Sequence, residues 1–256
     1  MAGGDEKDPK MSKIIDYPLN ADFSGVNTLQ AQGVIDTGNN LRDGIEGALS
    51  IENGVMKSTI TQSDTLTATA IRSEITAPAD SFTERWYVWE FMLPEGFNPN
   101  IAPISLMQIH DTPDGGDGAK AVPFALYYEQ AGYLAAHVPL QTLPAEGANF
   151  KPAGITDFER GRWHKACLHA FWSTTFTGFR EFYMDGVPLF RHFNLPAMYS
   201  DVTGPYLKLG CYDATHNARF GSCTAYFRNV AIWFGNDGYF TVMGGIPALS
   251  PQRVED

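Results

Sequence analysis

The sequence predicts an all-β protein, an antiparallel β-sandwich of the jelly-roll kind, on three observations. Apolar and polar residues alternate over many short segments, as in strands with one buried face. Turn signals such as Asn53-Gly54 and Asp185-Gly186 separate these segments at short intervals. No segment of ten or more residues has convincing helical periodicity, and no strand–helix–strand rhythm indicates a parallel sheet.

The expected strands follow one another closely along the chain. In order they cover residues 14–23, 48–51, 55–60, 65–75, 86–93, 104–110, 121–130, 133–138, 163–172, 178–185, 188–193, 206–212 and 223–234. Residues 141–159 lack periodicity and are rich in Gly and Pro, so we expect a long loop, either a lid over a groove or a decorative insertion. Without a repeat or linker, the chain is predicted to form one domain over 14–256, after a disordered tail or a cloning remnant over 1–13.

The composition limits the classes of partner. A net charge of −11 argues against nucleic acid or an anionic membrane surface as a partner. Aromatic residues make up 13% of the chain, which is common in β-rich and carbohydrate-binding proteins. Three cysteines without regular spacing predict buried free thiols and neither a disulfide framework nor a zinc site. The oligomeric state cannot be read from these features.

The location of the protein is only partly indicated. No apolar run approaches the ~18 residues of a membrane span. Met1–Lys13 lacks the hydrophobic core of a secretory signal. We therefore expect an extracellular, periplasmic or virion-associated protein, with any export signal outside this stretch or replaced by another route.

The stretch 206–212 stands out among the expected strands because one of its faces is uniformly apolar and the other carries reactive groups. It lies between Gly204-Pro205 and a polar run, and its length is typical of one strand. Alternation places Tyr206, Lys208, Gly210 and Tyr212 on one face. Two phenols and an ammonium in a row can hold a sugar acid and move its protons; an ordinary solvated strand face is the alternative.

Two further strands carry polar residues on one face. Arg72 and Glu74 share a face of the segment 65–75, and Leu106, Gln108 and His110 share a face of 104–110. Together with the 206–212 strand, these side chains suit β-elimination from a uronic acid polymer, in which the C5 proton is removed and the oxygen at C4 is expelled.

Each of these groups has a chemical reason to take part. Arg72, Gln108 and Lys208 can neutralise the carboxylate and so make the C5 proton more acidic. His110, with an ordinary pKa of about 6.5, is suited to accept that proton near neutral pH. A tyrosine can donate a proton to the leaving oxygen, or act as the base if a nearby cation lowers its pKa.

The three stretches resemble the motifs of a known family. Arg72-Ser73-Glu74-Ile75, Gln108-Ile109-His110 and the 206–212 stretch YLKLGCY are similar, in this order, to the RSELR, QIH and YFKAGxYNQ motifs of jelly-roll polysaccharide lyases, alginate lyases in particular. Residues 86–97 also resemble the branch containing heparin lyase I and glucuronan lyase. The resemblance implies a concanavalin A-like jelly roll with a concave substrate-binding sheet.

The resemblance also implies a role for each matching residue. Arg72 and Gln108 match the carboxylate neutralisers, and His110 matches the histidine that is the base or assists neutralisation. Tyr206 matches the general acid, which sometimes also acts as base, and Lys208 matches the lysine of the cleft.

The choice of catalytic tyrosine stays open at this level. In the heparin-lyase branch the tyrosine follows the lysine by four residues, which points to Tyr212 instead of Tyr206. The sequence also departs from the alginate lyase motifs, with Thr76 in place of the second arginine and Asp213-Ala214 in place of Asn-Gln. The identity of the uronic acid is therefore not predicted.

Three further residues are predicted to contact or organise the substrate. Glu74 would orient Arg72 through an ion pair, Trp172 would stack on a sugar ring, and Asp213 ends the central strand. A surface ion pair for Glu74 and a core position for Trp172 are the simpler interpretations.

No organic cofactor is expected. Asp111, Asp114 and Asp117 in a glycine-rich loop make a structural calcium ion the one metal to test for, although the loop lacks the glutamate of an EF-hand. His164 and His169 lie on opposite faces of their strand and cannot share a metal. Two other functions use the same fold: a non-catalytic carbohydrate- or receptor-binding module, and a glycoside hydrolase.

Overall fold

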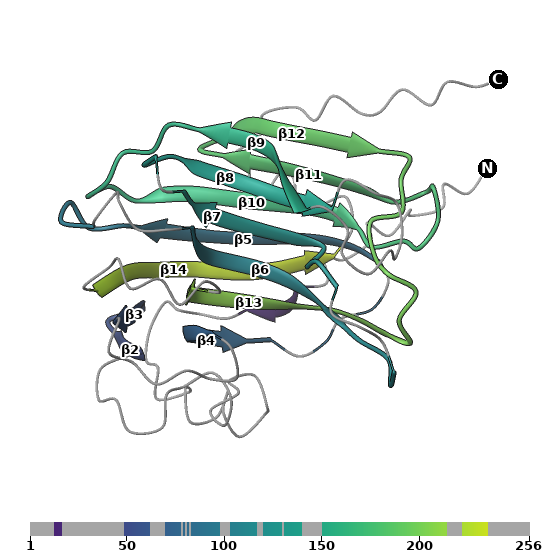
Figure 1. Cartoon of the computed structure of the whole chain (residues 1–256), viewed down its shortest axis with the longest axis horizontal. Helices are drawn as coiled ribbons and strands as arrows, with labels where there is room; N and C mark the ends of the chain where they lie inside the picture. The colour runs from purple at the N-terminus through teal and green to yellow at the C-terminus, as the bar shows by residue number, and fades with distance from the viewer. Residues whose placement is uncertain are drawn as a thin grey trace, which may run out of the picture.

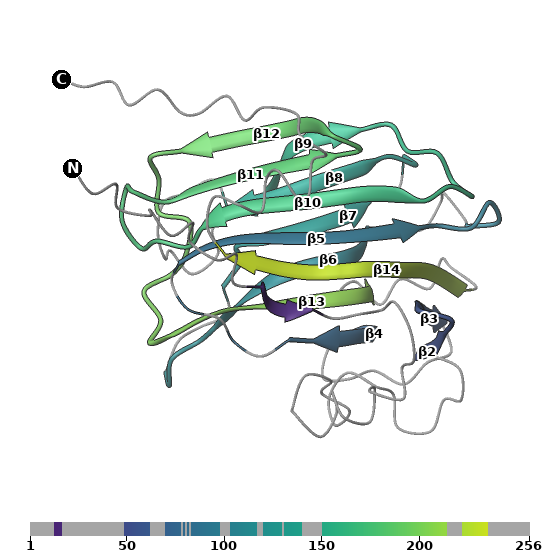
Figure 2. The ribbon, with the colours of Figure 1, turned by 180° about the vertical axis from the view of Figure 1, so that it is seen from behind.

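The structure is a computed structural model, and every regular element in its described part is a strand. The described residues are 13–16, 49–61, 70–77, 79, 81, 83–97, 103–116, 120–129, 131–139, 150–213 and 222–234. The all-β prediction is confirmed, since two antiparallel sheets pack face to face (Figures 1 and 2).

The first sheet has eight strands in the order β12-β11-β10-β5-β14-β3-β2, with β1 also paired to β14. Its members are β1 (Lys13–Asp16), β2 (Leu49–Glu52), β3 (Val55–Thr61), β5 (Glu84–Met92), β10 (His164–Phe171), β11 (Phe179–Met184), β12 (Val187–Phe193) and β14 (Ser222–Phe234). The second sheet has six strands in the order β4-β13-β6-β7-β8-β9. They are β4 (Ile71–Thr76), β6 (Ile104–Thr112), β7 (Phe124–Tyr128), β8 (Leu134–Pro139), β9 (Phe150–Thr156) and β13 (Thr203–Asp213).

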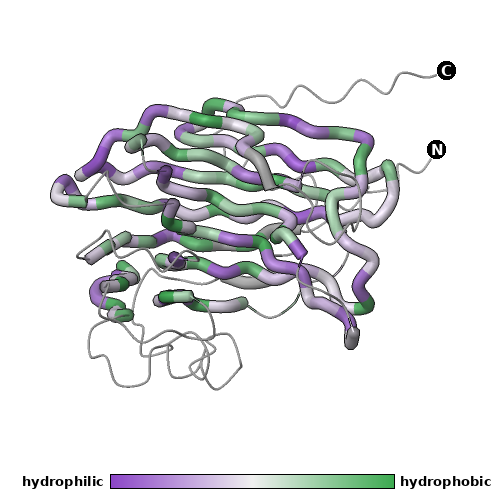
Figure 3. Tube along the Cα trace, viewed as in Figure 1, coloured by the Kyte–Doolittle hydropathy of each residue, from purple (hydrophilic) through white to green (hydrophobic). Residues whose placement is uncertain are grey.

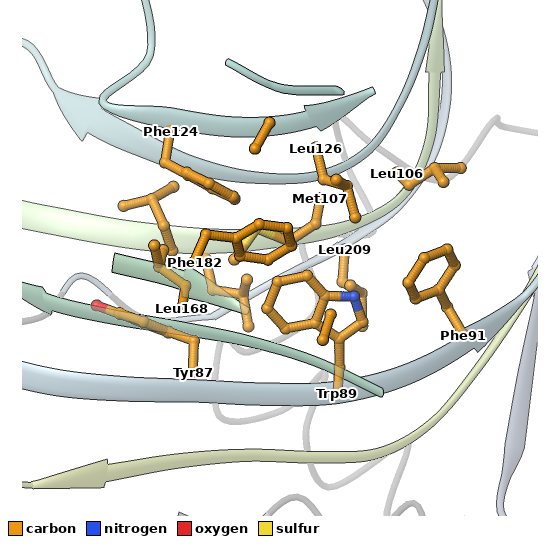
Figure 4. Packing of buried hydrophobic residues seen from close by; sticks show 14 of the residues in the cluster. Tyr87, Trp89, Phe91, Leu106, Met107, Phe124, Leu126, Leu168, Phe182 and Leu209 are labelled. Carbon is orange, nitrogen blue, oxygen red and sulfur yellow. The ribbon is translucent and has the colours of Figure 1, made fainter. Parts of the chain in front are cut away.

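The hydrophobic core lies between the two sheets. Polar and apolar residues alternate along many strands (Figure 3), so each sheet turns one apolar face inward. Trp89 and Phe182 of the eight-stranded sheet stack on each other, and the Phe182 ring centroid lies 5.2 Å from that of Phe124 in the other sheet (Figure 4). This core fixes which face of the six-stranded sheet remains outside, and that outer face carries the predicted site.

Two hairpin turns follow the turn chemistry expected from the sequence. Asn53 and Gly54 have φ angles of 50° and 75°, and Asp185 and Gly186 have 48° and 81°. Two successive positive φ angles define the turn whose twist matches a hairpin, and Asn-Gly and Asp-Gly accept them best. These turns set the pairing of β2 with β3 and of β11 with β12.

The predicted long loop over 141–159 is wrong for its second half, because β9 occupies residues 150–156. Pro152 is tolerated there since β9 is an edge strand, where one missing N–H leaves no inner ladder broken. A Cβ at Gly154 would lie 2.9 Å from Leu189 Cβ, so this glycine allows the close approach of β12. The rest of that segment, residues 141–149, lies outside the described residues.

Two smaller predictions also need correction. Leu106 does not share the face of Gln108 and His110, because the β6–β7 register shifts between Ser105 and Met107 and Leu106 joins the buried core. Lys13 already belongs to β1, so regular structure begins one residue inside the predicted tail. The single-domain boundary itself stays a prediction.

Candidate functional site

The three predicted stretches lie on adjacent strands of the six-stranded sheet. β13 is hydrogen-bonded to β4 on one side and to β6 on the other (Figure 1). Tyr212 pairs with Arg72 across the β13–β4 ladder. On the other side, Tyr206 pairs with His110 and Lys208 with Gln108. Segments far apart in the sequence therefore form one polar surface on the outer face of this sheet.

Tyr206 lies at the centre of the groups that could move a proton. Its ring stacks on that of His110 with centroids 5.2 Å apart and planes 26° from parallel. The Lys208 ammonium lies 5.6 Å from the centroid of the same tyrosine ring. A phenol, an imidazole and an ammonium group thus lie next to one another.

Tyr212 has a different environment on the same strand. The Arg72 guanidinium lies over its ring, 4.9 Å from the centroid. Burial raises the pKa of Tyr212, while the charge of Arg72 lowers it in part and that of Glu74 raises it further. Its phenol is therefore harder to ionise than usual, which makes Tyr212 poorly suited to act as a base.

Glu74 is almost completely buried beside these cations. Burial raises the pKa of its carboxyl group, and the charges of Lys208, Arg72 and His110 oppose that rise. Neither carboxylate oxygen has a hydrogen-bond partner within the described segments. The surface ion pair considered for Glu74 is wrong, because the side chain belongs to the interior of the site.

Gly210 explains how Glu74 fits under β13. The two residues face each other in the β4–β13 ladder, and Gly210 has a φ of 143°. A Cβ at Gly210 would lie 2.1 Å from the Ser73 carbonyl oxygen and 2.7 Å from the Glu74 Cα atom. Only glycine allows the two backbones to approach this closely.

Two predicted substrate contacts do not lie on this outer face. Trp172 is fully buried in the core, where its Nε1 donates a hydrogen bond to the Tyr87 hydroxyl over 2.8 Å. Asp213 is also fully buried; as the residue after Tyr212 it points to the opposite side of β13. The simpler interpretation of Trp172, a core position, is therefore confirmed, and Asp213 follows the alternation that places Tyr212 on the outer face.

Sequence reasoning missed Tyr127 of β7 and its neighbours on the same outer face. Tyr127 and Tyr212 both pair with Ser105, from opposite sides of β6. Burial raises the pKa of Tyr127, and the charges of Tyr212, Glu129 and Glu74 raise it further. The His137 ring is 4.8 Å from the Tyr127 ring, and its Nε2 is 2.8 Å from Glu129 Oε1. Alternation along the predicted β7–β8 hairpin placed these three residues on one face and could have identified them.

The metal prediction stays untested at the aspartate loop. Asp117 lies outside the described residues, and within the described ranges no group of three or more His, Cys, Asp or Glu side chains is arranged to hold a metal ion. His164 and His169 have separate carboxylate partners, Asp185 for the first and Glu84 with Glu181 for the second. In the part of the chain that is described, no helix is long and apolar enough to cross a membrane.

Comparison with known proteins identifies the family. The family model described as "Polysaccharide lyase" matches residues 21–231, so the chain belongs to this family of enzymes. No curated protein matches the sequence.

Solved structures share the fold at low sequence identity. An endo-β-1,4-glucuronan lyase from the fungus Trichoderma reesei has a TM-score of 0.59 and 19% identity over 73% of this chain and 83% of its own. The alginate lyase vAL-1 from Chlorella virus has a TM-score of 0.60 and 12% identity over 88% and 100%. An alginate lyase from Pseudomonas aeruginosa has a TM-score of 0.55 and 16% identity over 76% and 89%. The jelly-roll sandwich is therefore the architecture of known lyases.

Proposed function

We propose that this protein cleaves a uronic-acid polysaccharide by β-elimination at the outer face of β4, β13 and β6. The observation that supports this most directly is the pairing of Tyr206 with His110, whose rings stack next to the Lys208 ammonium. A hydrolase would need two suitably spaced carboxylates instead. Glu74, the acidic residue of β4 on this outer face, is instead buried among cations.

The first chemical requirement is neutralisation of the substrate carboxylate. A uronate resists loss of its C5 proton because the adjacent carboxylate is already negative. Arg72, Gln108 and Lys208 lie on three neighbouring strands and supply donors of both charged and neutral kinds. Fixed donors in a partly buried site stabilise the developing negative charge more strongly than water does.

The proton transfers then follow from the Tyr206–His110 pair. His110 accepts the C5 proton on Nε2, the electron pair of the C5–H bond forms the C4=C5 double bond, and the C4–O bond breaks. Tyr206 donates its phenolic proton to the departing oxygen. We favour Tyr206 over Tyr212 as the acid because Tyr206 contacts both His110 and Lys208, whereas Tyr212 is covered by Arg72.

Glucuronan and alginate are the first substrates to test, since the similar structures include lyases for both. The protein is incubated with each polymer, and with a glycosaminoglycan, while ultraviolet absorbance reports the unsaturated product of elimination. We expect absorbance to rise with at least one polymer for the wild type. The conservative variant Tyr206→Phe should lose this signal while keeping the melting temperature of the wild type.

Two results would contradict the proposal. Cleavage that yields saturated products would indicate hydrolysis. Binding to a polymer without any turnover would indicate a carbohydrate-binding module on the same fold.

A further inference from the structure

Asp111 lies directly beside His110 and has no role in the steps described above. His110 Nδ1 is 2.8 Å from the main-chain oxygen of Asp111 and 3.1 Å from its carboxylate Oδ1. The histidine side chain is 28% exposed, whereas that of the aspartate is 1% exposed. A buried carboxylate thus lies behind the imidazole, on the side away from solvent.

This contact determines which ring nitrogen can accept a proton. A carbonyl and a carboxylate are both acceptors, so Nδ1 must carry its hydrogen and donate it to the Asp111 oxygen. In a neutral imidazole the other nitrogen, Nε2, then holds the lone pair. His110 is therefore held in the tautomer that a base acting through Nε2 requires.

The carboxylate of Asp111 has few other partners. Neither of its oxygens accepts a hydrogen bond from any residue in the described segments. Its charge acts on Tyr199 and Asp201, and it raises the pKa of both groups. Asp201 is itself paired with Lys120, with Nζ and Oδ1 2.6 Å apart. His110 is thus a group in contact with Asp111 that can become positively charged.

The contact with Asp111 matters because a second cation, Lys208, lies near His110 in the site. Lys208 lies on the same outer face, and both it and His110 act on the buried Glu74. A proton taken up by His110 would therefore place a second positive charge close to Lys208, which is unfavourable without a negative partner.

We propose that Asp111 is a positioning residue for His110: its main-chain oxygen holds the tautomer of the ring, and its carboxylate balances the positive charge that the ring gains when it takes the C5 proton. This inference rests on the proposed β-elimination and adds a residue that the three sequence motifs do not include. The carboxylate acts through His110 and does not touch the substrate; its part is to stabilise the protonated ring by its charge, as the buried aspartate of a catalytic triad also does.

The test compares Asp111→Asn with Asp111→Glu and with a matched control. The asparagine keeps the shape and an acceptor oxygen but removes the charge. Asp114→Asn removes a charge from the segment directly after β6 and keeps an acceptor for the Val202 amide, which Asp114 Oδ1 binds over 3.0 Å. All variants are assayed on the polymer that the wild type cleaves, with and without a calcium chelator.

We expect Asp111→Asn to lower kcat about 10- to 100-fold, part of the contribution of a general base, with KM within about twofold of the wild type. Asp111→Glu should recover part of the rate, and Asp114→Asn should behave as the wild type. The nitrogen-15 NMR signals of the His110 ring should show protonated Nδ1 in the free wild-type enzyme. The melting temperature should not fall in Asp111→Asn, because the substitution replaces a buried carboxylate that accepts no hydrogen bond in the described segments with a neutral amide.

Three outcomes would overturn the proposal: unchanged kcat in Asp111→Asn, an equal loss in Asp114→Asn, or a loss that the chelator reproduces in the wild type. The second outcome would assign the effect to the loss of any negative charge in this region, and the third to a bound metal ion. If the wild type cleaves no uronate polymer, the proposed function fails. The NMR result then separately decides whether the main-chain oxygen of Asp111 fixes the tautomer of His110.

Discussion

The outer faces of the two sheets both bury charged groups, but they do so in opposite ways. On the eight-stranded sheet, His169 lies between two carboxylates, with Nε2 2.7 Å from Glu84 Oε1 and Nδ1 2.9 Å from Glu181 Oε2. Trp86 stacks on the imidazole at 3.6 Å, and Tyr183 donates a further hydrogen bond to Glu181. On the six-stranded sheet, Glu74 is more deeply buried, and its oxygens have no hydrogen-bond partner within the described segments.

This difference supports the proposal that chemistry takes place on the six-stranded sheet, while the charged cluster of the other sheet serves stability. Buried polar groups normally find partners, and a satisfied network holds its members in one arrangement. The His169 cluster follows this rule. The Glu74 site breaks it next to Arg72, Lys208 and His110, and such local conflicts are expected at functional sites. The two faces should therefore respond to substitution in different measurements.

The largest expected effect is on turnover at the six-stranded sheet. Tyr206→Phe should lower kcat by at least about 100-fold, because it removes the hydroxyl proton that the phenol beside His110 would donate to the leaving oxygen. Tyr212→Phe is the control and should retain most of the activity, since Tyr212 packs under Arg72. Product absorbance measures both, and the reverse order would assign the acid to Tyr212.

The next effect is on stability at the eight-stranded sheet. His169→Ala should lower the free energy of unfolding by about 2–4 kcal/mol, because it leaves two largely buried carboxylates without their shared donor. Urea unfolding measures the change, and kcat of the folded variant should stay close to that of the wild type. A loss below about 0.5 kcal/mol, the range of ordinary surface substitutions, would show that this network is not stabilising.

Gly210→Ala tests how closely β13 and β4 must pack at the site. The new Cβ would overlap the Ser73 carbonyl, and the backbone has a positive φ, so we expect a loss of about 1–3 kcal/mol together with lower activity. Gly96→Ala is the matched control, because nothing lies within 4 Å of its added Cβ. Thermal unfolding of both variants would show whether position 210 is special.

The smallest effect has the opposite sign. Glu74→Gln should be more stable than the wild type at pH 7, by about 1 kcal/mol, because an unsatisfied buried carboxylate is replaced by a neutral amide. Burial raises the pKa of the Glu74 carboxyl above the value of 4.5 that it has in the unfolded chain. The folded wild type therefore loses stability as the pH rises from 4.5 through the higher pKa of the folded state, because the buried group must give up its proton.

The difference between the two proteins should therefore shrink as the pH falls towards 4.5. Melting curves across this range would measure it. A stability advantage that does not change with pH would mean that the Glu74 charge is not its cause. The same variant should be less active, because Arg72 and Lys208 lose the negative charge that opposes theirs.

The strand pattern of the fold, and the face of β13 that carries the site, follow from the local sequence pattern. Alternation along residues 206–212 correctly separates the outer face from the core face, and the Asn-Gly and Asp-Gly turns set two hairpins. Local pattern failed where a strand breaks its own period. The β-bulge at Ser105–Met107 turned Leu106 inward, and Pro152 with Gly154 concealed the edge strand β9.

The sequence by itself determined the strand content, the turn types and the face on which Tyr206, Lys208 and Tyr212 lie, because each depends on residues close together in the chain. Only the tertiary structure decided that Tyr206 meets His110 while Tyr212 meets Arg72, that the buried Glu74 oxygens find no hydrogen-bond partner among the described residues, and that Asp111 lies against the imidazole. These relations depend on the register between strands distant in sequence and on the depth of burial. Both are set by the packing of the whole sandwich and leave no local pattern to read.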